Sequence, residues 1–314
     1  MVPLLQSGKP IRLSDKPILD RFWKLEYDRD NPPLYIADPM HAELENRTNM
    51  RYIIMPVEMD EVLVVYKVTK TMGKEYVHVI DKPMSIKGDA AHEAAVIESL
   101  RAQKTLFLFA ERHMGLYRNV KRKENYDNYY HDLEKDNAEK FGIGEWRRYA
   151  RVNLFLNNPS EYRLVRTPDF SEIAGAVEKC RKAWWSQKRE SSKDPGLPVI
   201  YRSASFTDGR VMHFAIFYKD ACLAHSMEIV DYDKSYSTSL YFSHIGRSPE
   251  QAPDGCDRTL LNELDKCRRY ASGTWLLEHG ITRKYCLGFG LGRSNIRRHK
   301  ETVCDGKIKY YTGE

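Results

Sequence analysis

The sequence predicts an α+β fold in two lobes, and three observations carry that prediction. Strand-like runs rich in β-branched residues alternate with amphipathic helical segments in both halves of the chain. The 314 residues are enough for two domains of ordinary size, each with its own core. Between Tyr117 and Phe155 the composition becomes basic and aromatic, as in a connecting segment. We expect lobes at 1–155 and 156–314, each a mixed, mostly antiparallel sheet with flanking helices.

The overall composition is that of a globular protein without a membrane span. Hydrophobic residues make up 42% and charged residues 30%, and no run approaches the roughly 20 apolar residues that a span needs. The opening MVPLLQSGKPIRL lacks the basic segment and long apolar core of a signal peptide, so we expect a cytoplasmic protein. The six cysteines never form a C-x-x-C pair, which favours buried thiols over a metal site or a disulfide framework.

In the first lobe, residues 16–27 are expected to form a helix with Ser14 or Asp15 at its N-cap. Segments 51–57, 62–69 and 76–80 have the β-branched composition of strands. Residues 90–104 are good helix formers, and 105–110 form a short apolar strand. A sheet with one helix before it and one within it follows from this order.

In the second lobe, a strand is expected from Tyr162 and a helix to about Ser186. Runs 199–206, 210–219, 222–231 and 237–245 then predict a meander, with a hairpin at Asp208-Gly209 and a second turn at Lys219-Asp220. A helix follows from Cys256 to His279-Gly280, where the glycine suits a helix end. A short strand, a glycine loop and a basic helix complete the lobe.

The glycine loop has a basic surrounding. Gly288, Gly290 and Gly292 are spaced as G-x-G-x-G, which does not match the dinucleotide fingerprint. From Ile281 to the end there are eight Lys and Arg against three Asp and Glu, a surplus of five in a chain of net charge +6. These charges form either a site for phosphates or a solvated basic face. They are Arg283, Lys284, Arg293, Arg297, Arg298, Lys300, Lys307 and Lys309.

The order of a helix ending in His279-Gly280, a strand ending in LGFG, Asn295 and then HK resembles the second half of GNAT-type acyltransferases. Within that superfamily it is most similar to the FemAB-like aminoacyl transferases and to the C-terminal domain of phosphatidylglycerol lysyltransferases, whose start the segment IRLSDKPIL also resembles. The resemblance implies tandem GNAT-like lobes, the first of them degenerate. It also implies transfer of an acyl or aminoacyl group from a carrier to an amine or hydroxyl, without a metal. One candidate acceptor is a modified base in DNA, as in the DNA hypermodification of bacteriophages.

The donor is either an aminoacyl-tRNA or an acyl-CoA. Coenzyme-A-dependent members hold the pyrophosphate on Q/R-x-x-G-x-G/A at the start of the long helix. Here the corresponding loop is GRSPEQAPDGCDRTLL, with Asp254 at the glycine position and only Gly255 nearby, which counts against acyl-CoA. A basic face would serve a tRNA donor or a nucleic-acid acceptor. The candidate cofactor-binding residues are Gly255, Arg258, Gly290, Arg293, Arg297 and Lys300.

The transfer needs a base for the attacking amine or hydroxyl. His244 and Glu228 are polar residues inside strand-like runs, and either is a candidate base or a structural residue with satisfied hydrogen bonds. His213 and His225 are weaker candidates. Asn295 matches the asparagine of the family pattern and completes the set of candidate catalytic residues.

A different class of function is a non-catalytic nucleic-acid-binding protein. In the segment 117–155, tyrosines interleave with Lys and Arg, the combination that stacks on bases and holds phosphates. The alternative is a connecting segment whose acids pair with its bases and whose tyrosines pack against a neighbouring core. The chain has no H-E-x-x-H, G-x-S-x-G or P-loop pattern, so metalloprotease, α/β-hydrolase and NTPase functions have no support.

Overall fold

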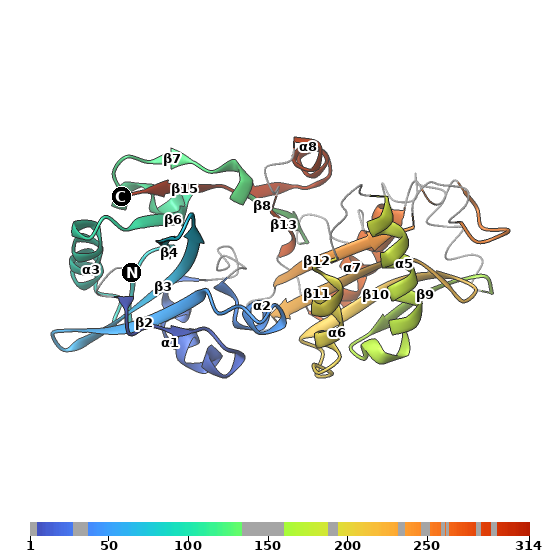
Figure 1. The fold of residues 1–314 in the computed structure, drawn as a ribbon, viewed down its shortest axis with the longest axis horizontal. Coiled ribbons are helices and arrows are strands. Elements are labelled where there is room, and N and C mark those ends of the chain that lie inside the picture. Colours follow the sequence, from blue (N-terminus) through green and yellow to red (C-terminus); the bar gives the residue numbers. More distant parts are fainter. Residues whose placement is uncertain are drawn as a thin grey trace. The chain divides into compact units, whose positions relative to one another are not determined.

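The structure is a computed structural model of the chain. It describes residues 5–27, 37–133, 160–187, 194–231, 236–245, 252–258, 261, 264–280, 284–289 and 294–314. The predicted lobe boundary at 155/156 lies outside these residues. The chain divides into two compact units, one of residues 1–130 with 288–314 and one of residues 131–287 (Figure 1). Two mostly antiparallel sheets with flanking helices confirm the predicted α+β class.

The first unit is built on a sheet with the strand order β1-β2-β3-β4-β6-β15-β7, to which β5 adds by pairing with β3. Cores form on both faces of the sheet, one with α1 and one with α3. The elements of the sheet and its helices are β1 (Lys9–Pro10), α1 (Lys16–Glu26), α2 (Pro39–Leu44), β2 (Met50–Val57), β3 (Asp60–Thr71), β4 (Lys74–Ile80), β5 (Met84–Ser85), α3 (Ala90–Ala102), β6 (Leu106–Ala110), β7 (Lys121–Arg122) and β15 (Tyr310–Gly313). The remaining elements are β8 (Asn128–Asp132), α8 (Ser294–Val303) and β14 (Gly306–Ile308).

Local sequence explains where these elements begin and turn. Asp89 caps α3 by accepting hydrogen bonds from the main-chain N–H groups of Ala91 and His92. Met72 and Gly73 both have positive φ, 51° and 76°, which is the conformation of a two-residue hairpin turn between β3 and β4. The predicted strands at 51–57, 62–69 and 76–80 therefore form a continuous meander.

The C-terminal strand belongs to the first unit. Strand β15 lies between β6 and β7 and pairs antiparallel with both, Tyr310 facing Ala110 across the ladder. Strand β14 pairs with β8, Lys307 facing Tyr129. A second lobe of 156–314 was expected to include these residues, whereas strand pairing places β15 in the first sheet. The sequence gives no local sign of this return, because it depends on a partner strand 200 residues away.

Strands β13 to β9 of the second unit belong to a sheet with the order β14-β8-β13-β12-β11-β10-β9. Helices α5 and α6 cover one face of the sheet and α7 covers the other (Figure 1). The core on the α5 side gathers small and aromatic residues of β10 and β11. The elements are β9 (Tyr162–Thr167), α5 (Ala174–Ser186), α6 (Leu197–Ser203), β10 (Val211–Tyr218), β11 (Ala221–Asp231), β12 (Tyr236–His244), α7 (Leu264–Glu278) and β13 (Lys284–Phe289).

One predicted strand of the second unit is a helix. Residues 197–203 form α6, which begins directly after Gly196 and has Pro198 in its first turn. The expected run 199–206 is therefore wrong, and so is the hairpin at Asp208-Gly209, which instead connects α6 to β10. The turn at Lys219-Asp220 does join β10 and β11. Gly280, with φ of 80°, follows the end of α7 as predicted.

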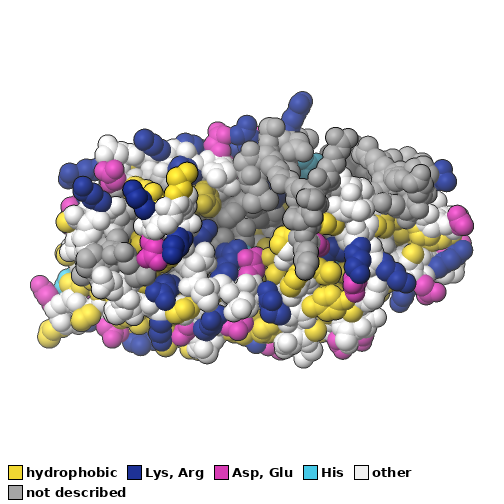
Figure 2. Space-filling view, in the orientation of Figure 1, with side chains coloured by type: hydrophobic (Ala, Val, Ile, Leu, Met, Phe, Trp, Pro, Cys, Tyr) yellow, Lys and Arg dark blue, Asp and Glu magenta, His cyan; other side chains and the backbone are white. Residues whose placement is uncertain are grey.

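Charge is distributed over both units. Figure 2 shows Lys and Arg side chains scattered over the visible face, with Asp and Glu among them.

Within the described part of the chain, no helix is both long and apolar enough to cross a membrane.

The position of β15 inside the first sheet makes Tyr310 a test of the fold. Its side chain is 2% exposed and packs in the core with α1, so Tyr310→Ala should lower the free energy of unfolding by roughly 3–5 kcal/mol through cavity formation. Tyr76→Ala, at a position 45% exposed on β4, is the matched control and should change it far less. Urea denaturation followed by circular dichroism measures both. Equal effects would contradict a buried place for β15.

Candidate active site

Strands β12 and β13 are parallel neighbours that pair only near the start of β12. Ser237 faces Tyr285 and Thr238 faces Cys286. Beyond Thr238, β12 continues for six residues to His244, and among the described residues its remaining pairs are all with β11. Within the part of the chain that the structure describes, one edge of β12 beyond Thr238 therefore has no partner strand.

The corresponding pair in the first unit is closed. There β4 and β6 are the parallel neighbours joined through a helix, and His78, Val79 and Ile80 pair with residues 106–108 up to the last residue of β4. The N–H of Asp81 then donates to the Leu108 carbonyl at 2.7 Å, which extends the pairing past the strand end. The opening between parallel strands is thus a property of the second unit.

A bulge in β12 lies next to this opening. From Met227 to His225 strand β11 advances two residues, while β12 advances three from Leu240 to Ser243. Tyr241 sits in this stretch with φ of 52°, which is strained for a residue with a side chain. Arg181 Nη1 donates to the Tyr241 carbonyl at 3.0 Å and holds the bulge. Bulges of this kind redirect side chains and are common beside active sites.

His244, the last residue of β12, has the geometry of a base. Its ring is half-buried and stacks on Phe242, with ring centroids 5.4 Å apart. Nδ1 lies 2.9 Å from the Ile245 carbonyl, which can only accept, so Nδ1 carries the proton of the neutral ring. Nε2 then has the lone pair, and no described residue is bonded to it. A proton acceptor is therefore available at Nε2.

Glu228, the second candidate base, is enclosed by the protein. Its side chain is fully buried on the α7 face, so it has no access to a substrate in this conformation. Oε1 accepts hydrogen bonds, while Oε2 has no partner among the described residues. Burial raises the pKa of Glu228, and Arg268 and Tyr285 oppose that rise. The donors to Oε1 are Tyr285 Oη at 3.0 Å, Ser226 Oγ at 3.1 Å and Ser272 Oγ at 3.3 Å.

Arg268 of α7 connects the buried carboxylate to the strands. Its Nη1 donates to Tyr285 Oη at 2.6 Å and to Ser239 Oγ at 3.1 Å, and lies 3.5 Å from Glu228 Oε1. Nη2 donates to Asp265 at 3.0 Å. The guanidinium also lies 4.6 Å from the centroid of the Phe242 ring, on which His244 stacks. A chain of contacts therefore runs from Glu228 through Arg268 and Phe242 to His244.

His213 and His225 form a separate structural pair on the opposite face. The Ser203 hydroxyl donates to the Ile200 carbonyl and so accepts from His213 Nε2 at 3.0 Å. His213 Nδ1 then accepts from His225 Nε2, also at 3.0 Å. Burial lowers the pKa of His213 to about 4 and that of His225 well below its ordinary value, so both rings are neutral. Neither is accessible to a substrate.

The remaining predicted site residues lie in different parts of the chain, and two of them are outside the described residues. Gly255 has φ of 80°, and a Cβ there would lie 2.8 Å from Tyr218 Oη, so the glycine is required by its surroundings. Arg258 is exposed. Asn295, Arg297 and Lys300 lie on α8 in the first unit, where Arg297 forms a partly exposed ion pair with Glu124. Gly290 and Arg293 lie outside the described residues.

Sequence reasoning missed Arg268 and Tyr285. An arginine among the charged residues of a predicted helix and a tyrosine in a predicted strand are both ordinary in a sequence. Only the burial of Glu228 shows that they are needed, because a buried carboxylate requires donors. Within the described residues there is no group of three His, Cys, Asp or Glu side chains that could hold a metal ion.

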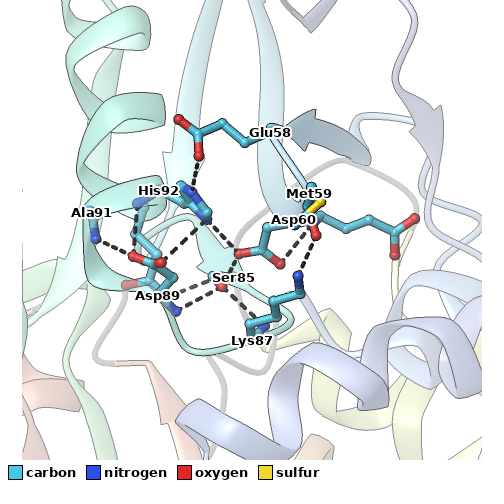
Figure 3. A network of polar contacts seen from close by, with 10 residues as sticks. Glu58, Met59, Asp60, Ser85, Lys87, Asp89, Ala91 and His92 are labelled. Atoms are coloured by element: carbon cyan, nitrogen blue, oxygen red, sulfur yellow. Dashed lines mark hydrogen bonds and ion pairs between the residues drawn. The ribbon is translucent and has the colours of Figure 1, made fainter.

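A second polar network, in the first unit, contains serine, aspartate and histidine but lacks the geometry of a nucleophile (Figure 3). Ser85 Oγ donates to Asp60 at 2.5 Å and accepts from the N–H groups of Lys87 and Asp89. His92 Nδ1 bonds to the same Asp60 oxygen at 2.9 Å and does not contact the serine. A catalytic serine gives its proton to the histidine, so this network is a clamp on the turn before α3.

Neither models of known protein families nor the sequences of curated proteins match this chain. Solved structures do. A conserved protein of unknown function from Bacteroides thetaiotaomicron VPI-5482 superposes with a TM-score of 0.66 at 15% identity, over 99% of each chain. L-PGS from Bacillus licheniformis gives 0.56 at 14% identity, over 98% of this chain and 94% of that one. FemX gives 0.56 at 12% identity, over 87% and 90%. The predicted likeness in fold to FemAB-like and lysyltransferase-type GNAT proteins is confirmed.

The clamp of Figure 3 yields a titration test. Burial raises the pKa of Asp60, but hydrogen bonds from Ser85, His92 and the Glu61 N–H together lower it to about 2. Its contribution to stability is therefore present above its ordinary pKa of 3.8 and lost as pH falls toward 2. Ser85→Ala should raise the Asp60 pKa by about one unit in a ¹³C-NMR titration. Ser99→Ala, which removes an exposed hydroxyl of α3, should not; an unmoved Asp60 in Ser85→Ala would contradict the clamp.

Glu228 predicts the opposite pH dependence. Because burial raises its folded pKa, its contribution to stability is full below the ordinary value of 4.5 and decreases as pH rises through the folded pKa. Glu228→Gln, which cannot ionise, should gain stability relative to wild type as pH increases from 4.5 to 8. Glu172 is an exposed glutamate of the same unit, and the free energy of unfolding of Glu172→Gln should change with pH in parallel with that of the wild type. Urea denaturation across the pH series decides, and parallel curves for Glu228→Gln would overturn the assignment.

Proposed function

We propose that the second unit is the catalytic unit of a transferase that moves an acyl or aminoacyl group from a carrier to an amine or hydroxyl. Two features of the described residues carry this proposal: the edge of β12 beyond Thr238 has no strand pairing there, and His244 at the end of β12 has no described partner at Nε2. The closed β4–β6 pair fits a first unit without this chemistry. The fold shared with FemX and L-PGS supports the same reaction class.

The groups at the opening fit the needs of the reaction. His244 Nε2 takes the proton as the amine or hydroxyl attacks the carbonyl carbon of the donor. Main-chain N–H groups on the unpaired edge of β12 are donors of the kind that stabilise the oxyanion. The bond to the carrier then breaks, and His244 returns its proton to the departing oxygen or sulfur. Glu228 acts as a positioning residue through Arg268 and Phe242 rather than as the base.

An aminoacyl-tRNA is the donor we favour over acyl-CoA. Asp254 occupies a position where CoA-dependent members of the superfamily have glycine, and a carboxylate there would repel a pyrophosphate. A cytoplasmic location would give access to charged tRNA. The acceptor is an amine or hydroxyl, and a modified base in DNA remains one candidate of that chemistry.

The alternative of a non-catalytic nucleic-acid-binding protein is less well supported. Two tyrosines of the segment proposed to stack on bases are buried. Tyr117 packs on Phe109 with ring centroids 4.1 Å apart, and Tyr129 is 1% exposed. The stretch 134–155 lies outside the described residues. Buried rings cannot stack on bases, which favours the packing interpretation of Tyr117 and Tyr129.

The test is turnover of a carrier. The protein is incubated with aminoacyl-tRNA, or with an acyl-CoA, and a mixture of amine and hydroxyl acceptors, and release of uncharged tRNA or of free thiol is measured. His244→Ala should lower turnover about 100-fold or more while carrier binding is unchanged, because only the proton acceptor is lost. Added imidazole should restore part of the rate.

His279→Ala is the matched control, since that ring stacks on Trp275 at the far end of α7 and should leave turnover unchanged. Full activity of His244→Ala would return His244 to a structural role. No release from either carrier by the wild-type protein would overturn the proposed function itself.

A further inference from the structure

A hollow in the first unit is lined mainly by residues whose side chains can donate hydrogen bonds. It has a volume of about 690 Å³ and lies where β3 extends past β2. The last pair between the two strands is Met50 with Lys67, and β3 continues four residues farther to Thr71. The step between the strands creates the hollow. Its lining is Thr48, Asn49, Arg51, Lys67, Val68, Thr69, Lys70, Thr71 and Glu75.

The charge of the lining is positive and only partly compensated. Arg51, Lys67 and Lys70 face one acid, Glu75, which leaves a surplus of two positive charges. Arg51 faces Tyr66 across the ladder, where burial raises the pKa of the phenol and the positive charge of Arg51 lowers it, so Tyr66 supplies no negative charge. Within the described part of the chain, no carboxylate forms an ion pair with Lys67. A cationic hollow without matching acids favours an anionic ligand.

The cations flank the free edge of β3 from its two faces. Lys67 faces Met50 across the ladder and Arg51 faces Tyr66, so Lys67 lies on one face of the sheet and Arg51 and Lys70 lie on the other.

The Lys67 side chain is half-buried, and burial together with the nearby Arg47 lowers its pKa. Glu45, the acid nearest to this cation pair, is already bonded to Arg47 and His41. His78 faces Lys67 directly across the β3–β4 ladder, and burial, Lys67 and Lys123 lower its pKa. A bound anion would relieve this mutual repulsion.

We infer that the hollow between Arg51, Lys67 and Lys70 is a binding site for phosphoryl groups, carried either by a small phosphorylated ligand or by a nucleic-acid backbone. Two lysines and an arginine supply charge-assisted donors to phosphate oxygens. The hydroxyls of Thr48 and Thr71 and the amide of Asn49 add neutral donors of the kind found around phosphates. The site lies within one unit and does not rest on the proposed transfer reaction.

Calorimetric titration of the full chain with sodium pyrophosphate, and separately with an eight-nucleotide single-stranded RNA, tests this site. Lys67→Gln should weaken binding of the better ligand at least tenfold, and Arg51→Gln similarly. Glu75→Gln, which removes the acid, should strengthen it. Lys24→Gln is the matched control, because it makes the same charge change at an exposed position of α1 outside the hollow.

The two sources are separated by comparing the ligands. Tighter binding of pyrophosphate than of RNA indicates a small phosphorylated ligand. Tighter binding of RNA indicates a nucleic-acid backbone. In that case the slope of log K against log salt concentration should be smaller in Lys67→Gln by about one unit. Lys70→Gln, at an exposed position, gives the same reading should Lys67→Gln not fold. Absence of binding by either ligand, or equal weakening in Lys24→Gln, would overturn the site.

Discussion

The buried contact between Glu228 and Arg268 is the constraint on which the second unit depends. A carboxylate fully removed from water needs donors, and those it receives come from β11, β13 and α7, so one carboxylate fixes a helix against two strands. Arg268 adds β12 through Ser239 and Phe242. Truncating one partner of such a pair costs about 3–5 kcal/mol, because the other charge is left buried. Replacing both by apolar residues would cost far less in stability but would remove the support beneath Phe242, and with it the fixed orientation of His244.

The elements that sequence reasoning placed correctly have local causes. Strands β2, β3 and β4 follow from β-branched runs and a positive-φ turn at Met72-Gly73, and α3 follows from an aspartate cap and good helix formers. Two elements were misplaced. For α6 a local signal was present but was given too little weight, and for β15 no local signal exists. Residues 199–203 are apolar enough for a strand, and the prediction followed that composition. Gly196 and Pro198, however, are typical of a helix start, and the segment is the helix α6. The return of β15 to the first sheet depends on pairing with β6 at long range, which periodicity cannot reveal.

The candidate site was predictable to the same extent. His244 and Glu228 stand out in the sequence because polar residues inside strand-like runs need partners, and both are indeed held by hydrogen bonds. Their roles could not be separated without burial, since exposure distinguishes a side chain that can reach a substrate from one that supports it. For the basic C-terminal segment, too, the sequence alone does not show which charges have partners. Arg297 counts as a free charge in the sequence, but folding brings Glu124 against it, and an ion pair of this kind at the surface adds little to stability.

The two units differ in how far their parallel strands pair, and this difference underlies the proposal that the second unit is the catalytic one. In each unit a helix connects two parallel strands, but β4 pairs with β6 to its last residue and β12 leaves β13 after Thr238. Pairing up to Ile80, extended by the bond from the Asp81 N–H to the Leu108 carbonyl, occupies the edge of β4 that faces β6. An open edge costs stability unless something else holds the strand, and here β11, the Arg181 contact to the bulge and the Glu228–Arg268 network do so. The buried polar network and the open strand are therefore linked, because contacts of the network hold β12 in place where it has no pairing with β13.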